Sequence, residues 1–375
     1  MAIDELSAYE RWMDEQGIPV HTGYDVPDIR ALERKPWPRT GGKGCLIDLK
    51  GMEGFTNGIL CEIPPRAALK AQKQLFQEMV YVVEGSGHTD VWAPGQEQKK
   101  ARCEWRAGTL LSIPLNCWSQ MVNDGSSPAV CFAVTDAPLV LDIFHDQEFI
   151  FENDHRFAKR FDGSGEYFAD RGDRLSSPRG VLWEANAIYD VPNASVDALP
   201  VKGSDVKRTY LGMAEGSLTG HLGDEPVGKH GKAHHHVGGA VILMLRAHGY
   251  TLMWPSELGV RPYESGFGDR VVRIEWGPYA LFSPPTGWFH QHFNTSSETS
   301  REIAFRFGNA LYHPTRFHAG IPHAGGLPAF LVSYHQGGTL IPYEDEDPRI
   351  HADYEQALRA RGLACTMLHP SHRAA

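Results

Sequence analysis

Three histidines in two separate stretches of the chain have the residue type and spacing to bind a metal ion. His234 and His236 stand two residues apart in 228–236, and His290 lies in 277–294. Side chains two apart in a strand point to the same face, so His234 and His236 can hold one ion from one side. Three neutral imidazoles with open positions suit a divalent transition metal, iron among the candidates. The sequence therefore predicts a metal centre that is presented to a substrate.

Three further residues are candidates for the chemistry beside this ion. His292 follows His290 by two residues, so it is expected on the same face, where an imidazole can accept and donate protons. Arg246 has the strand parity to point inward and contact a substrate, and Tyr250 is a second proton-transfer candidate. Simple packing for His292 and a solvated strand end for Arg246 are the alternatives.

Arg306 is a further candidate for a substrate contact. Its neighbours Ile303, Phe305 and Phe307 alternate onto the opposite face of the same strand and look like the core side. This pattern predicts that Arg306 points away from the interior. His313, His318, His323 and His335 follow it in the tail, where surface loops are expected.

The composition is that of a globular protein with a sizeable core. The chain has 375 residues, of which 42% are hydrophobic and 22% charged, and its net charge of −10 disfavours nucleic acid as a partner. The six cysteines form no CxxC pair, so we expect reduced, mostly buried thiols in a cytoplasmic protein. The N-terminus lacks a secretory signal pattern and no apolar run is long enough to span a bilayer.

Short alternating strands separated by turns predict an all-β protein with two tandem barrels. Residues 1–45 are expected to form an N-terminal helix, at 3–16, and an extended arm. The first barrel is expected at 46–145, a connector with one or two helical turns at 146–205, and the second barrel at 206–310. Loops and a helix near 351–361 complete the chain in 311–375.

The two β-rich regions repeat one another. Residues 84–94 align with 246–255, with a glycine, a threonine and a tryptophan at the same relative positions, and Gly108 to Asn123 aligns with Gly277 to Asn294. Such self-similarity is the sequence signature of one structural unit used twice.

Alignment of the two repeats shows that the barrels differ at the positions of the metal ligands. Opposite the three histidines, the first barrel carries two amides and a hydroxyl, at Gln72, Gln74 and Ser119. These groups are poor ligands for such metals, so the first barrel is predicted to be metal-free, with a role in packing, dimerisation or closing over the second site. Glu78 is expected to remain there as a hydrogen-bonded residue.

These motifs resemble those of the cupin superfamily, G-x5-H-x-H-x3–4-E-x6-G and G-x5-P-x-G-x2-H-x3-N. The second barrel carries Gly228-x5-His234-x-His236-x3-Ala240, followed by Pro285-x-Gly287-x2-His290-x3-Asn294. The resemblance covers both barrels and leaves the arm, connector and tail outside it. It implies a bicupin, in which two double-stranded β-helix (jelly-roll) barrels lie in tandem.

Ala240 stands where the superfamily has its glutamate, which leaves three histidines and no carboxylate. This variant is similar to the bicupin ring-cleaving dioxygenases of the gentisate, salicylate and hydroxynaphthoate type. The resemblance implies Fe(II), O2 as co-substrate and a hydroxylated aromatic substrate. Ile242 replaces the arginine expected to hold the substrate carboxylate in those enzymes, so the substrate lacks a carboxylate or is held differently.

The leading functional hypothesis is therefore an Fe(II)-dependent dioxygenase that cleaves a hydroxylated aromatic or related chelating substrate. The first alternative is a non-redox isomerase, lyase or hydrolase that uses Mn, Zn or Ni as a Lewis acid. The second is a non-catalytic, ligand-binding bicupin. The expected partners are a small-molecule substrate and O2, with a second copy of the chain in a homo-oligomer.

Overall fold

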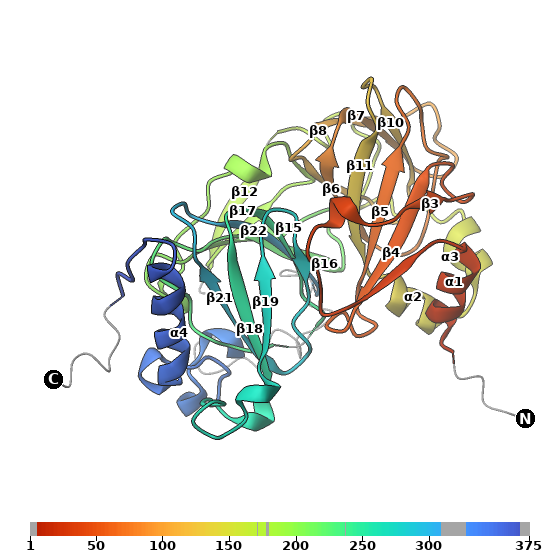
Figure 1. Cartoon of the computed structure of the whole chain (residues 1–375). Helices are drawn as coiled ribbons and strands as arrows, with labels where there is room; N and C mark the ends of the chain where they lie inside the picture. The colour runs from red at the N-terminus through yellow and green to blue at the C-terminus, as the bar shows by residue number, and fades with distance from the viewer. Residues whose placement is uncertain (1–5, 171, 178–179, 237, 309–327, 368–375) are drawn as a thin grey trace, which may run out of the picture.

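The computed structural model describes residues 6–170, 172–177, 180–236, 238–308 and 328–367, and His313, His318 and His323 lie outside these ranges. Two β-barrels lie side by side, with helices at the two far ends (Figure 1). Each barrel consists of a large sheet of eight strands and a small sheet of three strands. The predicted fold class, all-β with two tandem jelly-roll barrels, is confirmed.

The first barrel is built mainly from residues 43–135. Its large sheet has the order β1 (Val20–Gly23), β4 (Lys43–Leu49), β5 (Asn57–Ile63), β11 (Ala129–Thr135), β6 (Glu78–Glu84), β9 (Leu110–Ile113) and β14 (Ala187–Ile188), with β3 (Lys35–Pro36) paired to β4. Its small sheet has the order β10 (Trp118–Asn123), β7 (Ser86–Trp92) and β8 (Ala101–Arg106).

The second barrel repeats this arrangement. Its large sheet has the order β12 (Asp173–Ser177), β13 (Gly180–Glu184), β15 (Lys207–Gly212), β16 (Leu218–Asp224), β22 (Arg301–Phe307), β17 (Val241–Arg246), β20 (Leu281–Phe282) and β2 (Asp25–Val26). Its small sheet has the order β19 (Val272–Trp276), β18 (Gly249–Pro255) and β21 (Trp288–Asn294).

Strands of the arm and of the connector pair with strands of both barrels. In the arm, β1 and β3 pair with β4 of the first barrel, while β2 pairs with β20 of the second. In the connector, β14 pairs with β9 of the first barrel and β13 pairs with β15 of the second. The predicted helical turns are present near its start, but the strands of the connector were not predicted. These exchanged strands tie the two barrels together.

In the part of the chain that the structure describes, four α-helices cover the outer ends of the barrels (Figure 1). The helix α1 (Ala8–Gln16) begins at a Ser7–Glu10 capping box and ends at Gly17, whose φ of 66° suits glycine. It lies with α2 (Ala137–Phe144) and α3 (Gln147–Glu152) against the first barrel, while α4 (Pro348–Arg359) covers the second. Among the described residues no helix has the length and apolar character needed to cross a membrane.

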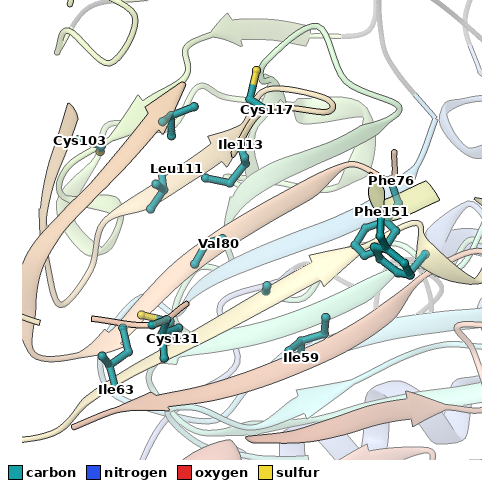
Figure 2. Packing of buried hydrophobic residues seen from close by; sticks show 14 of the residues in the cluster. Ile59, Ile63, Phe76, Val80, Cys103, Leu111, Ile113, Cys117, Cys131 and Phe151 are labelled. Carbon is teal, nitrogen blue, oxygen red and sulfur yellow. The ribbon is translucent and has the colours of Figure 1, made fainter. Parts of the chain in front are cut away.

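Apolar side chains at every second position of the strands fill the interior of the first barrel. In β8, Ala101, Cys103 and Trp105 are buried while the residues between them are exposed, the pattern of a strand with one face on a core. Figure 2 shows Leu111 and Ile113 of β9, with Val80 of β6 and Cys131 of β11, in the same cluster. The six cysteines are free thiols, as predicted.

A separate core lies between the two barrels. It contains Phe132 and Val134 from β11 of the first barrel and Ile303 and Phe305 from β22 of the second. The rings of Phe132 and Phe305 meet edge to face at 6.3 Å, and both are fully buried. The apolar outer faces of the two large sheets are therefore buried against each other.

The internal repeat is confirmed in three dimensions. Gly87 and Gly249 occupy the same place in the two small sheets, where an added Cβ would lie 1.9 Å from the carbonyl oxygen of Val122 or 2.0 Å from that of Phe293. Two residues later, a threonine accepts a hydrogen bond from a tryptophan indole in each barrel, at 3.0 and 3.1 Å. The repeated glycine is therefore required by a close backbone crossing.

We predict that Phe132→Ala lowers the free energy of unfolding by about 3–5 kcal/mol, because it opens a cavity between the two barrels. Phe267→Ala is the control, since Phe267 is 40% exposed and its loss is expected to cost about 0.5 kcal/mol or less. Denaturant unfolding followed by circular dichroism measures both. Equal effects of the two substitutions would contradict a shared core.

Candidate metal centre

The three predicted ligands come together in the second barrel. His290 lies in β21, and His234 lies in the extended segment before β17, where it forms an isolated bridge with His290. The backbone N–H of His234 donates to the carbonyl of His290 at 3.2 Å, and the reverse bond is 2.9 Å. With His236, one ligand nitrogen from each residue lies within 4.8 Å of the others.

Backbone carbonyls fix the tautomer of two of these rings. The Nδ1 of His234 lies 3.1 Å from the carbonyl oxygen of Lys232, and the Nδ1 of His290 lies 3.2 Å from that of Trp288. A carbonyl oxygen only accepts, so each Nδ1 carries the hydrogen and each Nε2 keeps its lone pair. Holding one ring nitrogen in this way is how proteins orient metal-binding histidines.

Burial keeps all three imidazoles in the form that binds metals. Desolvation lowers the pKa of His234, His236 and His290 well below the usual value, and the neighbouring imidazoles and Lys202 lower it further. The rings are therefore neutral at pH 7. A cluster of neutral, oriented nitrogens with no carboxylate fits a divalent transition metal such as Fe(II), Mn(II), Zn(II) or Ni(II).

The three histidines open onto a cavity of about 50 Å³ inside the barrel. Ala240 and Ile242 line it, so both of these residues face the barrel interior. Phe330, from the short helix Ala329–Leu331, forms another wall. The site is thus a small chamber with apolar walls around the metal-binding edge.

A buried ionic network forms the polar wall of this cavity. Arg208 of β15 pairs with Glu225 and lies 3.2 Å from Oε1 of Glu302 in β22, and the same Oε1 lies 3.5 Å from Nε2 of His221. Burial opposes ionisation of Glu302, but Arg208 and His221 hold its pKa well below the usual range. Burial lowers the pKa of His221 to about 4, so this histidine is neutral at pH 7. Glu302 is therefore a fixed anion that Arg208 neutralises.

Two further basic side chains border the cavity. Lys202 and Arg306 both approach the ring of Phe330, with their charged groups 4.8 and 5.2 Å from its centre. Burial lowers the pKa of Lys202, and repulsion from Arg208 and Arg306 adds to this effect. An anion brought into the cavity would relieve that repulsion and stabilise the charged form of Lys202.

His292 lines the cavity on the same side as His290, as predicted from their spacing. Its Nδ1 lies 2.8 Å from the hydroxyl oxygen of Thr251 on β18. Burial lowers the pKa of His292 to about 4, so the ring is neutral at pH 7. It can accept a proton from a substrate, but it does not hold a proton in reserve as an imidazolium.

The other two predicted catalytic residues lie away from the cavity. A β-bulge between Met244 and Arg246 breaks the alternation of β17, and the Arg246 Nε donates to the carbonyl of Thr299 at 3.0 Å. Tyr250 faces the opposite side of β18 from its neighbour Thr251, where its ring stacks on Phe293 at 4.6 Å. Neither borders the chamber, so both are removed from the candidate catalytic set.

The prediction that Arg306 points away from the interior is wrong. Arg306 lines the cavity together with Glu302 and Ala304, while Ile303 and Phe305 face the other way, into the core between the barrels. The apolar face of this strand was interpreted as the barrel interior. Ala304 pairs with Ile242, which lines the cavity, so Arg306, two residues after Ala304, faces the cavity as well. This inference requires the strand register, which the sequence alone does not provide.

The first barrel keeps the backbone of the site without its ligands. Gln72 and Ser119 form the same isolated bridge as His234 and His290 do in the second barrel. Gln74 donates to a carboxylate oxygen of Glu78 at 3.2 Å, as expected of a hydrogen-bonded residue. Burial raises the pKa of Glu78 to about 7, which Gln74 and Arg39 only partly oppose.

Comparison with known proteins adds little to this picture. No protein-family model matches the chain, and no curated protein matches it. Among solved structures, oxalate decarboxylase from Bacillus subtilis at pH 4.6 aligns with a TM-score of 0.48 and 10% identity, over 76% of each chain. An arginine-to-alanine mutant of that enzyme gives the same score and identity over 80% of this chain and 81% of its own. Alignments with so low a score and identity do not assign an activity to this chain, and the resemblance to ring-cleaving dioxygenases stays a prediction.

We predict that His236→Ala lowers the metal content of the purified, metal-loaded chain by one equivalent, because two imidazoles alone hold a divalent ion weakly. His235→Ala is the matched control. His235 lies outside the ligand cluster, and its ring packs edge-on against Phe289 at 4.8 Å. Elemental analysis measures both, and retention of the full metal content by His236→Ala would refute this ligand set.

We predict a pH-dependent stability effect at Glu78. The folded-state pKa of about 7 lies above the unfolded value of 4.5, so the folded state binds more protons between these values and stability falls as pH rises through this range. Glu78→Gln removes this loss, and its advantage over the wild type should grow by about 2 kcal/mol between pH 5 and pH 7. Denaturant unfolding at pH 5 and pH 7.5 measures it, with exposed Glu84→Gln as control. A constant difference across pH would exclude the effect.

Proposed function

We propose that the chain is a metal-dependent enzyme that acts on a small, anionic, oxygen-rich substrate, with the ion serving as a Lewis acid rather than a redox centre. The observation that carries this proposal is the combination of three neutral histidines with Lys202 and Arg306 around one small chamber. The natural substrate class is a short carboxylate with a neighbouring hydroxyl, carbonyl or second carboxylate, which can chelate the ion.

The size of the chamber supports a substrate of few atoms. Its volume is about 50 Å³ among the described residues. An engineered protein cavity that binds benzene has a volume of about 150 Å³, so a hydroxylated aromatic ring would require the walls to move. A small carboxylate requires much less space.

The charges around the chamber support an anion. The three ligands are neutral, so a bound divalent ion keeps its full charge at the site. Arg208 pairs directly with Glu225 and Glu302. Lys202 and Arg306 bring positive charge beside Phe330, where a planar carboxylate can pair with the guanidinium and a second oxygen can approach the histidine cluster.

The residues of the chamber suggest a division of roles. A bound divalent ion would supply Lewis acidity, which lowers the pKa of a coordinated hydroxyl group or water. Arg306 and Lys202 would hold the carboxylate, and apolar Ile242 and Phe330 would restrict access of bulk water. His292, neutral at pH 7, would accept the proton that a substrate hydroxyl or C–H group releases.

The ring-cleaving dioxygenase is the second candidate. Ala240 in place of a carboxylate favours it, because an all-histidine set with three open positions leaves room for a bidentate substrate and O2. Fe(II) would then be the resident metal, and the hydroxylated aromatic would enter only after displacement of a wall such as Phe330.

Turnover with and without oxygen separates the two candidates. The chain is loaded in turn with Mn(II), Zn(II), Ni(II) and Fe(II) and incubated with short hydroxy-, oxo- and dicarboxylates, and separately with dihydroxy-aromatic acids. The proposal expects products by NMR from a short carboxylate under argon. O2 uptake with an aromatic substrate, and no turnover of any carboxylate, would establish the dioxygenase instead.

We predict that Arg306→Met raises KM for the carboxylate substrate by roughly 10- to 100-fold, the value of one charge-assisted hydrogen bond, while metal content is unchanged. Arg246→Met is the matched control, because Arg246 lies on the neighbouring strand at the end that pairs with Arg301, away from the chamber, and binds the carbonyl of Thr299. Steady-state kinetics measures both. An unchanged KM for Arg306→Met would remove Arg306 from substrate binding.

A further inference from the structure

A second group of potential ligands lies on the other face of β21. His290 and His292 point into the barrel, so Gln291 between them points outward. There it lies in contact with His230 and Glu346. His351 of α4 completes a group in which one ligand atom from each of His230, Glu346 and His351 lies within 4.8 Å of the others. His230 is fully buried.

The hydrogen bonds of Gln291 fix the tautomer of His230. The amide nitrogen of Gln291 donates to the carbonyl of Gly231 at 2.8 Å and to Oε2 of Glu346, which uses both of its hydrogens. Its 2.9 Å approach to the His230 Nδ1 is therefore not a third hydrogen bond. The Nδ1 instead donates its own hydrogen to the Gly231 carbonyl at 3.0 Å. With its hydrogen on Nδ1, the His230 ring leaves Nε2 with a lone pair.

This lone pair faces a carboxylate oxygen. The Nε2 of His230 is buried without a hydrogen-bond partner among the described residues, and it lies 3.6 Å from Oε1 of Glu346. Two electron-rich atoms repel one another when nothing lies between them, and 3.6 Å is long for an N–H···O hydrogen bond. Two ligands of one tetrahedral zinc ion, each at about 2.0–2.1 Å, lie roughly 3.4 Å apart. The observed spacing matches a shared cation better than a shared proton.

The burial of the group points to a structural ion. His230, Glu346 and His351 are 0%, 3% and 4% exposed, so no substrate has access to them. His351 also belongs to a neighbouring group with Glu355 and Cys365, whose ligand atoms again lie within 4.8 Å. The helix α4 and the segment that follows it therefore bring nitrogen, oxygen and sulfur donors to one place, the set that Zn²⁺ prefers.

We propose that His230, Glu346 and His351 bind a structural Zn²⁺ that fastens α4 to the outer face of β21. The helix is already held there by the hydroxyl of Tyr354, which donates to the carbonyl of Asn294 at 2.9 Å. The ion ties three separate segments together: the turn before His234, the segment before α4, and α4 itself. One strand then supports a metal site on each face, an open one within the barrel and a closed one beneath the helix.

Zinc stoichiometry of the full chain tests this proposal. The protein is stripped with chelator, refilled with ZnCl2, desalted and measured by elemental analysis. We expect two equivalents in the wild type, one in His236→Ala, one in His351→Ala and none in the double variant. His335→Ala is the matched control, since His335 lies nearby in sequence but its side chain is 57% exposed, and it should keep two equivalents.

A second measurement covers the case in which His351→Ala fails to fold. Glu346→Gln keeps the size of the side chain and removes the charge, and it should also lose one equivalent. In the His236→Ala background, chelator should lower Tm by roughly 5 °C, and adding Glu346→Gln should abolish this shift. A His236→Ala chain that binds no zinc, or that keeps its zinc when Glu346 is changed, would overturn the proposal. Both readouts are independent of the proposed activity.

Discussion

The paired backbone hydrogen bonds between His234 and His290 are the constraint on which the candidate metal centre depends. They hold the segment before β17 against β21, so that side chains far apart in the sequence meet at one edge of the barrel. The first barrel has the same pair of bonds between Gln72 and Ser119. The scaffold is therefore common to both halves, and the side chains alone decide which half can hold a metal.

Alternation along the strands determines what each side chain can do. On β21 the odd and even positions serve different environments: His290 and His292 face the chamber, and Gln291 faces the group beneath α4. On β22 the same rule sends Glu302 and Arg306 into the chamber, and Phe305 into the core between the barrels. One backbone thus supports binding on one face and packing on the other.

The electrostatics of the chamber follow from burial. An uncompensated buried charge is costly, and here Arg208 forms direct ion pairs with Glu302 and Glu225, while burial raises the pKa of Glu225 to about 7. The imidazoles stay neutral for the same reason, since burial disfavours their charged form. The basic side chains of Lys202 and Arg306 lie beside Phe330 at the border of the chamber, and they are the basis on which we propose an anionic substrate.

The sequence by itself determined the two barrels, the repeat, the three clustered histidines, the inward position of His292 and the loss of ligands from the first barrel. All of these depend on local spacing, which period-two geometry converts directly into position. Only the tertiary structure decided whether Arg246, Tyr250 and Arg306 face the chamber. A bulge redirects Arg246, a covering helix makes the outer face around Tyr250 apolar, and the partner barrel buries the face opposite Arg306. None of these is encoded in the alternation of one strand, because an apolar face shows that something covers it but not which element does.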